Sequence, residues 1–253
     1  MQASRRQSDI LHQVRLSGSC AISELAGRLG VSSETIRRNI QPLVEGGQLH
    51  RVRGGVVLPD RVQEAPFQRR LAERGEAKRR IADAVAGMIR DGESLMLDTG
   101  STTAYVAQAL SAHSELTVVT NCTEIARTLA HRNGNRVFIA GGELRADDAA
   151  VFGPSAIDFV SQFQVQRAVL SIGAVSAALD FMDYHLCEAE FSRAVIQQAQ
   201  QIIIVADGSK FGRQGLIRVC GPDAVDRLVT DQSLDARYVE GLSVADVQIC
   251  IAG

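Results

Sequence analysis

Apolar residues recur at helical spacing in three short segments near the start of the chain, residues 6–16, 22–29 and 33–40. Gly30 follows the second segment, and a residue without a Cβ atom permits the left-handed turn that ends many helices. Ser32 is placed to cap the third segment. The alternating stretch at 49–57, divided by a Gly-Gly pair, then predicts a β-hairpin. Together these elements predict a winged helix-turn-helix.

The third helical segment has one apolar and one polar face. Ile36, Ile40 and Leu43 form the apolar stripe, so the polar residues between them point outward. Outward hydroxyl and guanidinium groups can bind phosphates and base edges, and arginines on a hairpin can approach the DNA backbone or minor groove. The candidate DNA-binding residues are Ser32, Ser33, Thr35, Arg37, Arg38, Arg51 and Arg53. An ordinary solvated surface is the alternative interpretation, since exposed arginine is common.

From residue 76 onward, helical and strand patterns alternate. Helical patterns occupy residues 76–89, 102–110, 124–130, 187–200 and, more weakly, 222–227. Strand patterns occupy residues 94–98, 117–120, 136–140, 167–172, 202–206 and 247–251. Such alternation is typical of an α/β domain with a mainly parallel sheet.

The stretch 58–77 contains prolines and charges without strong apolar periodicity, which indicates a connector whose second half could be helical. We therefore expect a winged helix-turn-helix at 1–60, a linker at 61–78 and an α/β domain at 79–253.

The end of the first predicted strand has the composition of a phosphate cradle. Ligands of open α/β sheets bind outside the carboxyl ends of the strands. A glycine turn and three hydroxyls here lead into a helix N-terminus, whose free N–H groups attract anions. Simple N-capping, the alternative, would need only one hydroxyl. The candidate ligand-binding residues of this segment are Asp98, Gly100, Ser101, Thr102 and Thr103.

Later strand ends add further polar candidates. Lys210 follows the strand at 202–206 and lies beside Asp207 and Ser209, where its ammonium group could bind phosphate as a point charge. The remaining candidates for effector binding are Asn121, Gly141, Gly142, Asp183 and Glu188. The two glycines could equally form a turn without a ligand. The two carboxylates, near His185, could bind sugar hydroxyls or could be capping and surface groups.

The composition is that of a folded globular chain, with 45% hydrophobic and 22% charged residues in 253. The apolar runs are far shorter than the roughly 18 residues that a membrane-spanning helix requires. No apolar stretch follows the basic N-terminal residues, so we expect no secretory signal and a cytoplasmic location.

The net charge of −2 hides an asymmetry along the chain. Residues 1–61 contain nine arginines and five carboxylates, which gives this segment a charge of +4 and leaves −6 for the remainder. A basic first domain favours contact with nucleic acid.

The cysteines and histidines give no sign of a metal or disulfide framework. Five cysteines are scattered without a C-x-x-C spacing, and the five histidines form no H-E-x-x-H motif. We expect reduced thiols, no metal site, no cofactor and no catalytic residue.

Several stretches resemble the DeoR-type bacterial transcriptional regulators, over nearly the whole chain. ISELAGRLGVSSETIRRNI and LHRVRGG are similar to the helix-turn-helix and wing of that family. EAKRRIADAVAGMI, DGESLMLDTGSTT, VVTNCTEIA, IAGGELR and VADGSKFGR are similar to its effector domain. The resemblance implies a sensor domain related to ribose-5-phosphate isomerase that binds a phosphorylated sugar or polyol as inducer.

The chain departs from the family pattern at three places. Asn39 stands where the family usually has Asp after the arginine pair, which could change a local salt bridge. Pro42 lacks an N–H group, so the third helix is predicted to kink or to end near Gln41. At residues 178–183 the family usually has a glycine before a Thr-Asp or similar pair, and this chain has neither. The effector could therefore differ from that of other family members.

The leading hypothesis is a repressor of a carbohydrate or polyol operon. It would bind double-stranded operator DNA as a homo-oligomer, a dimer or tetramer, and would be released by a phosphorylated sugar or polyol. The alternative is a sugar-phosphate isomerase-like enzyme with an appended DNA-binding head, in which Asp98, Glu188 or Asp207 acts as base and Lys210 as electrostatic partner. An activator or an architectural DNA binder is a third hypothesis.

Overall fold

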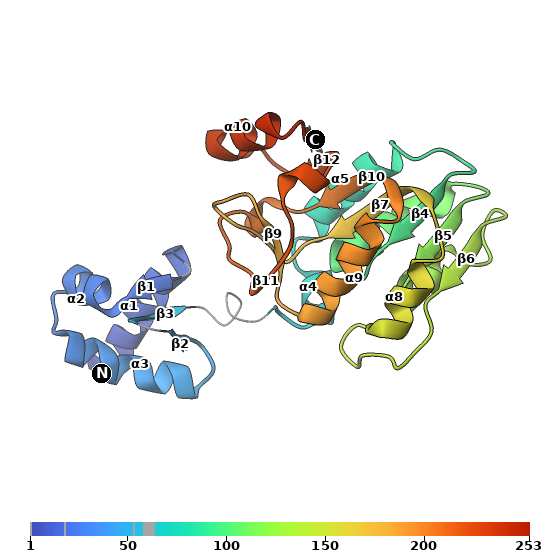
Figure 1. The fold of residues 1–253 in the computed structure, drawn as a ribbon. Coiled ribbons are helices and arrows are strands. Elements are labelled where there is room, and N and C mark those ends of the chain that lie inside the picture. Colours follow the sequence, from blue (N-terminus) through green and yellow to red (C-terminus); the bar gives the residue numbers. More distant parts are fainter. Residues whose placement is uncertain (1, 18, 53, 58–63) are drawn as a thin grey trace. The chain divides into compact units, whose positions relative to one another are not determined.

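The computed structural model describes residues 2–17, 19–52, 54–57 and 64–253. The chain divides into two compact units, Met1–Glu64 and Ala65–Gly253 (Figure 1). The second unit begins inside the stretch 61–78 that we expected to be a linker. Phe67 and Lys78 within that stretch are buried.

The first unit is a winged helix-turn-helix, as the sequence predicts. Its elements are α1 (Gln2–Ser17), β1 (Ser19–Ala21), α2 (Ile22–Leu29), α3 (Ser33–Glu45), β2 (His50–Val52) and β3 (Gly55–Val57). The strands form an antiparallel sheet in the order β1-β3-β2. Gly30 ends α2 with a φ of 63°, in the left-handed region expected for it.

The apolar stripe of α3 forms the centre of this unit. Ile36 and Ile40 are fully buried and Leu43 nearly so, packed against Ile10 and Val14 of α1 among other apolar side chains. The inward orientation predicted for α3 is therefore confirmed.

The prediction near Gln41 was a kink or an end of the third helix. The end is wrong, because α3 continues through Pro42 to Glu45. Pro42 lies on the exposed side, whereas Ile40 and Leu43 on either side of it are buried. Burial of an apolar face contributes most of the stability of a protein helix, so it outweighs the hydrogen bond that proline cannot make. Asn39 donates its side-chain N–H to the carbonyl oxygen of Thr35 at 2.8 Å, a bond that an aspartate could not donate.

The second unit is built on a seven-stranded parallel sheet in the order β13-β12-β10-β7-β4-β5-β6. These strands are β4 (Ser94–Leu97), β5 (Thr117–Thr120), β6 (Arg136–Ile139), β7 (Val165–Ser171), β10 (Ala199–Val205), β12 (Arg227–Thr230) and β13 (Gln248–Ile251). A small antiparallel sheet contains β8 (Ala174–Val175), β9 (Phe181–Asp183) and β11 (Ile217–Cys220). The mainly parallel α/β fold is thus confirmed.

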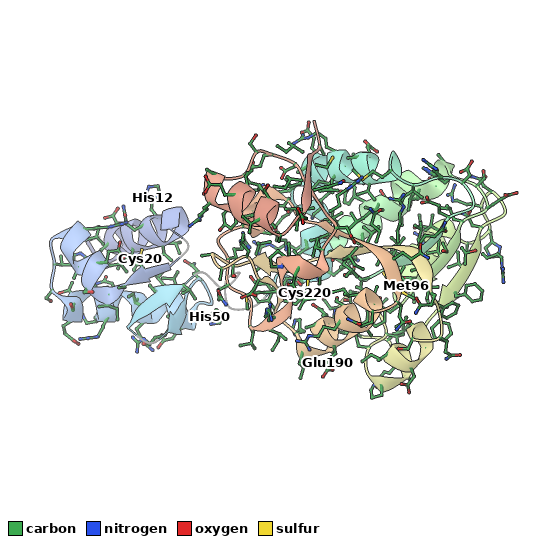
Figure 2. The ribbon with its side chains drawn as sticks, turned by 45° about the horizontal axis from the view of Figure 1, so that its top comes forward. His12, Cys20, His50, Met96, Glu190 and Cys220 are labelled. Atoms are coloured by element: carbon green, nitrogen blue, oxygen red, sulfur yellow. The ribbon has the colours of Figure 1, made fainter. Side chains whose placement is uncertain are left out.

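Seven helices of the described part of this unit are α4 (Phe67–Ala72), α5 (Gly75–Ala86), α6 (Ser101–Ala109), α7 (Thr123–Leu129), α8 (Pro154–Val160), α9 (Leu186–Ile196) and α10 (Ala236–Val244). Successive strand residues point to opposite faces of a sheet, which gives two apolar cores. Leu95 and Leu97 of β4 join the core under α5, α6 and α7. Met96 between them joins the core under α8, α9 and α10 (Figure 2).

The second unit differs from the prediction in several places. The strands β8, β9 and β11 were not predicted, and β10 begins at Ala199, inside the helix predicted at 187–200. The helix expected at 222–227 is only a 3₁₀ turn (Pro222–Ala224), and Arg227 begins the unpredicted strand β12. Leu228 and Val229 are fully buried because β12 lies between β10 and β13. The helices α8 and α10 were also not predicted, although Pro154 at the start of α8 is a typical first helical residue.

No helix of the described residues is both long and apolar enough to cross a membrane. No disulfide forms among the described residues, and Cys20 and Cys220 lie in different units (Figure 2).

The order of the strands reverses at β4. The next strand in sequence, β5, pairs on one side of β4, whereas β7 pairs on the other side. The chain leaves β4 toward β5 and leaves β7 toward β10, in opposite directions across the sheet. In open α/β sheets such a reversal is expected to form a crevice at the carboxyl ends of the two strands. This topological switch point is where a ligand of an open α/β sheet is expected.

Candidate functional site

The start of α3 presents hydroxyl and guanidinium groups. The Ser32 hydroxyl accepts the backbone N–H of Thr35 at 3.2 Å, which is the expected N-cap. Arg37 and Arg38 are exposed. Arg37 lies 3.4 Å from the carboxylate of Glu34. An exposed ion pair of this kind contributes little, so Arg37 can exchange Glu34 for a phosphate.

The other candidate DNA-binding residues are less uniformly exposed. Ser33 and Thr35 are half-buried on α3, and Arg51 is exposed on β2. Arg53 lies outside the described residues. The described candidates thus lie on two elements, the third helix and the wing.

The turn after β4 approaches the end of β7 so closely that only glycine fits. A Cβ atom on Gly100 would lie 1.9 Å from the Ser171 Oγ and 2.6 Å from its Cβ. Space and not conformation requires the glycine, because its φ of −170° is open to any residue. Gly100 is also the N-cap of α6, so none of the three following hydroxyls caps the helix in the ordinary way.

Hydrogen bonds of Asp98 stabilise the contact between the turn after β4 and the end of β7. Its two carboxylate oxygens accept the backbone N–H of Ser171 at 3.0 and 3.1 Å. Burial raises the pKa of Asp98 well above its ordinary value, although the bond from Ser171 opposes the shift. The Thr103 hydroxyl donates to the carbonyl oxygens of Asp98 and Gly100 at 2.9 and 3.0 Å. Asp98 and Thr103 therefore shape the turn, and Ser101 and Thr102 are buried at the start of α6.

Asn121 ties the end of β5 to its neighbours. Its Oδ1 accepts the Thr99 hydroxyl at 3.0 Å, and its Nδ2 donates to the carbonyl oxygen of Val151 at 2.9 Å. Gly142 has a φ of 152°, and a Cβ there would lie 2.6 Å from Val151. Gly141 is exposed with open space around it. The positive φ and the contact with Val151 therefore account for the glycine at position 142 without a ligand.

Arg145 is a polar residue of this edge that the sequence analysis missed. Its guanidinium contacts the carboxylates of Asp148 and Glu188 and lies 4.3 Å from the ring centroid of Phe152. Burial alone would lower the pKa of Arg145, but the hydrogen bonds and charges of Asp148 and Glu188 raise it. A signal was available, because Arg145 ends the motif IAGGELR directly after a predicted strand.

The structure brings Asp183 and Glu188 together. One carboxylate oxygen of Asp183 lies within 4.8 Å of one of Glu188. Asp183 also accepts the backbone N–H of Tyr184 at 3.0 Å. With Arg145 bound to Glu188, this part of the edge offers charged groups of both signs that could bind hydroxyls.

Basic residues surround Asp207 at the end of β10. The carboxylate of Asp207 accepts the backbone N–H of Ser209 at 2.9 Å and lies 3.6 Å from the Arg74 guanidinium. Burial would raise the pKa of Asp207, but the Ser209 bonds and the charges of Lys210 and Arg74 lower it below its ordinary value. Lys210 is half-buried in the 3₁₀ turn Gly208–Lys210.

Lys78 is a second residue that the sequence analysis missed. It is 4% exposed, and its ammonium donates to the carbonyl oxygen of Arg70 and, at 2.8 Å, to that of Glu73. Burial lowers the pKa of Lys78 to about 8, although the charge of Asp207 opposes the shift. Its place on the inward face of α5, next to Ala77 and one turn before Ile81 and Ala82, was the available signal.

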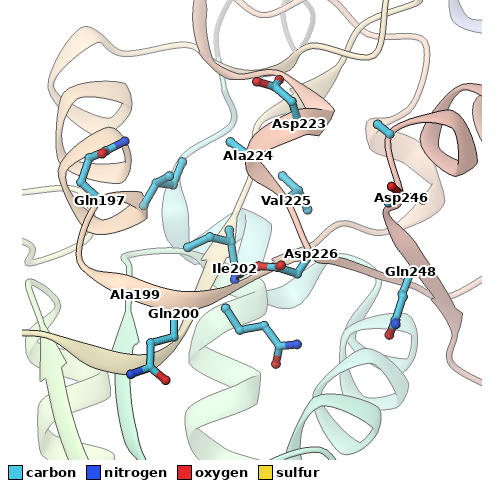
Figure 3. A pocket seen from close by; sticks show the side chains of 13 residues that line it. Gln197, Ala199, Gln200, Ile202, Asp223, Ala224, Val225, Asp226, Asp246 and Gln248 are labelled. Carbon is cyan, nitrogen blue, oxygen red and sulfur yellow. Dashed lines mark hydrogen bonds between the residues drawn. The ribbon is translucent and has the colours of Figure 1, made fainter.

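A hollow of about 550 Å³ lies at the opposite edge of the sheet, beside the amino ends of β10, β12 and β13 (Figure 3). Its 13 lining residues include Asp223, Asp226 and Asp246 but no lysine or arginine. Such a lining does not suit an anion. The sheet edge that carries Gly100 is therefore the better candidate for a phosphate.

Both units of the chain match models of known protein families. Residues 6–62 match the DeoR-like helix-turn-helix domain, and residues 73–232 match the DeoR C-terminal sensor domain. The chain belongs to the DeoR family.

Relatives of this DeoR-family chain match along its whole length. The glycerol-3-phosphate regulon repressor of Escherichia coli is 33% identical over 98% of this chain and 99% of the relative. The transcriptional repressor CsqR of the same organism is 32% identical over 97% of this chain and 94% of the relative. The ribose-5-phosphate isomerase A structure from Methanocaldococcus jannaschii has a TM-score of 0.39 at 16% identity and covers 54% of each chain. The sequence relatives favour a transcriptional regulator over an isomerase.

Substitution of Gly100 by alanine tests the close approach at the switch point. We expect Gly100→Ala to lower the free energy of unfolding by about 1–3 kcal/mol, because overpacking forces neighbours apart. Ser171→Gly removes the two atoms that the new Cβ would approach most closely, so the double variant should recover much of the loss. Thermal unfolding of both single variants and the double variant measures this coupling. Additive losses would contradict the close approach.

The buried ammonium of Lys78 predicts a pH dependence of stability. Below pH 8 Lys78 is charged in the folded and unfolded states, and its burial destabilises the fold. Between about pH 8 and 10.5 the folded protein loses this proton first, so the unfolding free energy should rise by about 3 kcal/mol relative to Lys78→Met. Denaturant unfolding of both proteins across this interval measures the difference. A constant difference would contradict the prediction.

Proposed function

We propose that this protein is a transcriptional repressor that binds operator DNA through α3 and the wing and is released by a phosphorylated sugar or polyol. The observation that carries the proposal is the N-terminus of α6 at the switch point of the sheet. Gly100 brings this N-terminus against β7, and Ser101 and Thr102 follow it. A helix N-terminus with free N–H groups in such a crevice binds phosphate.

The polar groups around this N-terminus divide by chemistry. The N–H groups of residues 101–103 and the ammonium of Lys210 would bind the phosphate. Asp183, Glu188 and Arg145 would bind hydroxyl groups of the sugar or polyol. The name of the relative that represses a glycerol-3-phosphate regulon supports a small phosphorylated effector.

DNA would be bound by α3 in the major groove. Ser33, Thr35, Arg37 and Arg38 lie along the start of this helix, and Arg51 and Arg53 of the wing would contact the backbone or minor groove. A homo-oligomer in the cytoplasm, dimer or tetramer, would place two such helices on paired half-sites. The effector must bind the free and DNA-bound forms with different affinity, because equal affinity would shift nothing.

Two variants separate the DNA-binding and effector-binding roles. The operator is first recovered from a random DNA pool by selection with the wild-type protein. Arg38→Ala should weaken operator binding about fivefold or more and reduce the slope of log K against log salt by about 1. Lys210→Ala should leave operator affinity unchanged and raise the effector concentration for release about tenfold, because it removes a charged hydrogen-bond donor.

The control for both variants is Arg132→Ala, which removes an exposed arginine from the second unit. Effectors are found by thermal shift with glycerol 3-phosphate, ribose 5-phosphate and fructose 6-phosphate, each beside its unphosphorylated analogue, since a bound ligand raises the melting temperature. Equal loss of operator binding in Arg38→Ala and Lys210→Ala would overturn the assignment of roles, and no shift with any phosphorylated compound would overturn phosphate sensing.

A further inference from the structure

The helix α4 is the first helix of the second unit (Figure 1). Hydrogen bonds from other elements hold both of its ends. At its N-terminus, the backbone N–H of Phe67 donates to both carboxylate oxygens of Asp147, at 3.0 and 3.2 Å. Phe67 itself is 2% exposed. Asp147 belongs to the loop after β6 and directly precedes Asp148, which binds Arg145.

The C-terminal carbonyl groups of α4 are held by α5 and α6. The Tyr105 hydroxyl donates to the carbonyl oxygen of Leu71 at 3.2 Å. Tyr105 lies on α6, one turn after Ser101, so the helix that begins at the phosphate cradle also contacts α4. The ammonium of Lys78 on α5 holds the carbonyl groups of Arg70 and Glu73.

The corner between α4 and α5 contacts the loop after β10. Arg74 has a φ of 52°, a left-handed conformation that is unfavourable for a residue with a Cβ. Its guanidinium lies 3.6 Å from Asp207, three residues before Lys210. Gly75 follows, and a Cβ there would lie 2.8 Å from the Tyr105 hydroxyl. The corner is therefore held in an uncommon conformation by contacts with α6 and with the Asp207 loop.

The other side of α4 is not fully packed. A hollow of about 370 Å³ lies beside the Phe67–Asp147 contact, and its lining includes Phe67, Leu71, Thr123 and Asp147. Leu71 of α4 and Thr123 of α7 therefore line a hollow at this side of α4.

We propose that α4 is the element through which effector occupancy reaches the DNA-binding unit. This inference rests on the proposed function. A phosphate bound beside Lys210 would repel the carboxylate of Asp207 and attract the guanidinium of Arg74. The contact between Arg74 and Asp207, which holds the corner between α4 and α5, would therefore change. Tyr105 and Asp147 connect the same helix to α6 and to the Arg145 loop. Because α4 follows the first unit directly along the chain, its displacement acts on the segment that joins the units.

The first test is hydrogen exchange of the α4 amides in the full-length wild-type chain. Exchange in residues 67–74 is measured with and without each phosphorylated compound of the thermal-shift panel, beginning with glycerol 3-phosphate. We expect the compound that raises the melting temperature to change α4 exchange at least threefold. The wild-type measurement requires no variant and is therefore independent of any folding defect.

The second test uses the double variant Tyr105→Phe/Asp147→Ala. Its affinity for the phosphorylated compound should stay within about threefold of the wild-type value. The factor by which the compound lowers operator affinity should be at least tenfold smaller in the double variant than in the wild-type protein. The control is Asp91→Ala, which removes another exposed carboxylate that accepts a backbone N–H, that of Ser114 at 2.7 Å. Asp91→Ala should respond like wild type.

The outcomes separate this inference from the proposed function. Binding of a phosphorylated compound with unchanged α4 exchange, or with full release of DNA from the double variant, would overturn the role of α4 and leave the repressor intact. No binding of any phosphorylated compound would overturn the proposed effector itself, and the role of α4 with it.

Discussion

The contact between the turn after β4 and the end of β7 fixes the carboxyl edge of the parallel sheet at its switch point. Gly100 leaves no room for a side chain against Ser171, and both oxygens of Asp98 accept the Ser171 N–H. These two bonds join the strands between which the chain reverses its direction across the sheet. The N-terminus of α6 is fixed at the switch point because this contact is fixed, and Asn121 at the end of β5 bonds to Thr99 of the same turn.

Charge at this edge is arranged in small clusters that contain groups of both signs. Arg145 lies between Asp148 and Glu188, and Asp207 has Arg74 and Lys210 as neighbours. Buried charges are tolerated only when they are paired and hydrogen-bonded, so each cluster restricts the positions of the loops that carry it. A phosphate that enters such an edge changes the balance of a cluster and hence the preferred position of its loop. In the repressor that we propose, this change is the source of the signal.

The sequence predicted the elements with strong periodicity and the residues at strand ends, because both depend on local patterns. The N-cap at Ser32, the strand at 94–98 and the polar run after it are of this kind. The order of the strands in the sheet was not predictable from the sequence. The contact between Asp98 and Ser171, which are 73 residues apart, depends on that order and was not predictable either. From the sequence alone, Asp98 is a candidate ligand-binding residue. In the structure its carboxylate accepts the backbone N–H of Ser171 in β7 instead. The helix α3 passes Pro42 because tertiary burial outweighs local propensity.

A crystal structure of the full-length protein with the phosphorylated compound that raises its melting temperature tests the central claim most directly. The account predicts that the phosphate contacts the N–H groups of Ser101, Thr102 and Thr103, with the Lys210 ammonium within hydrogen-bond distance. A phosphate bound elsewhere, for example in the acidic hollow beside the amino ends of β10, β12 and β13, would contradict it.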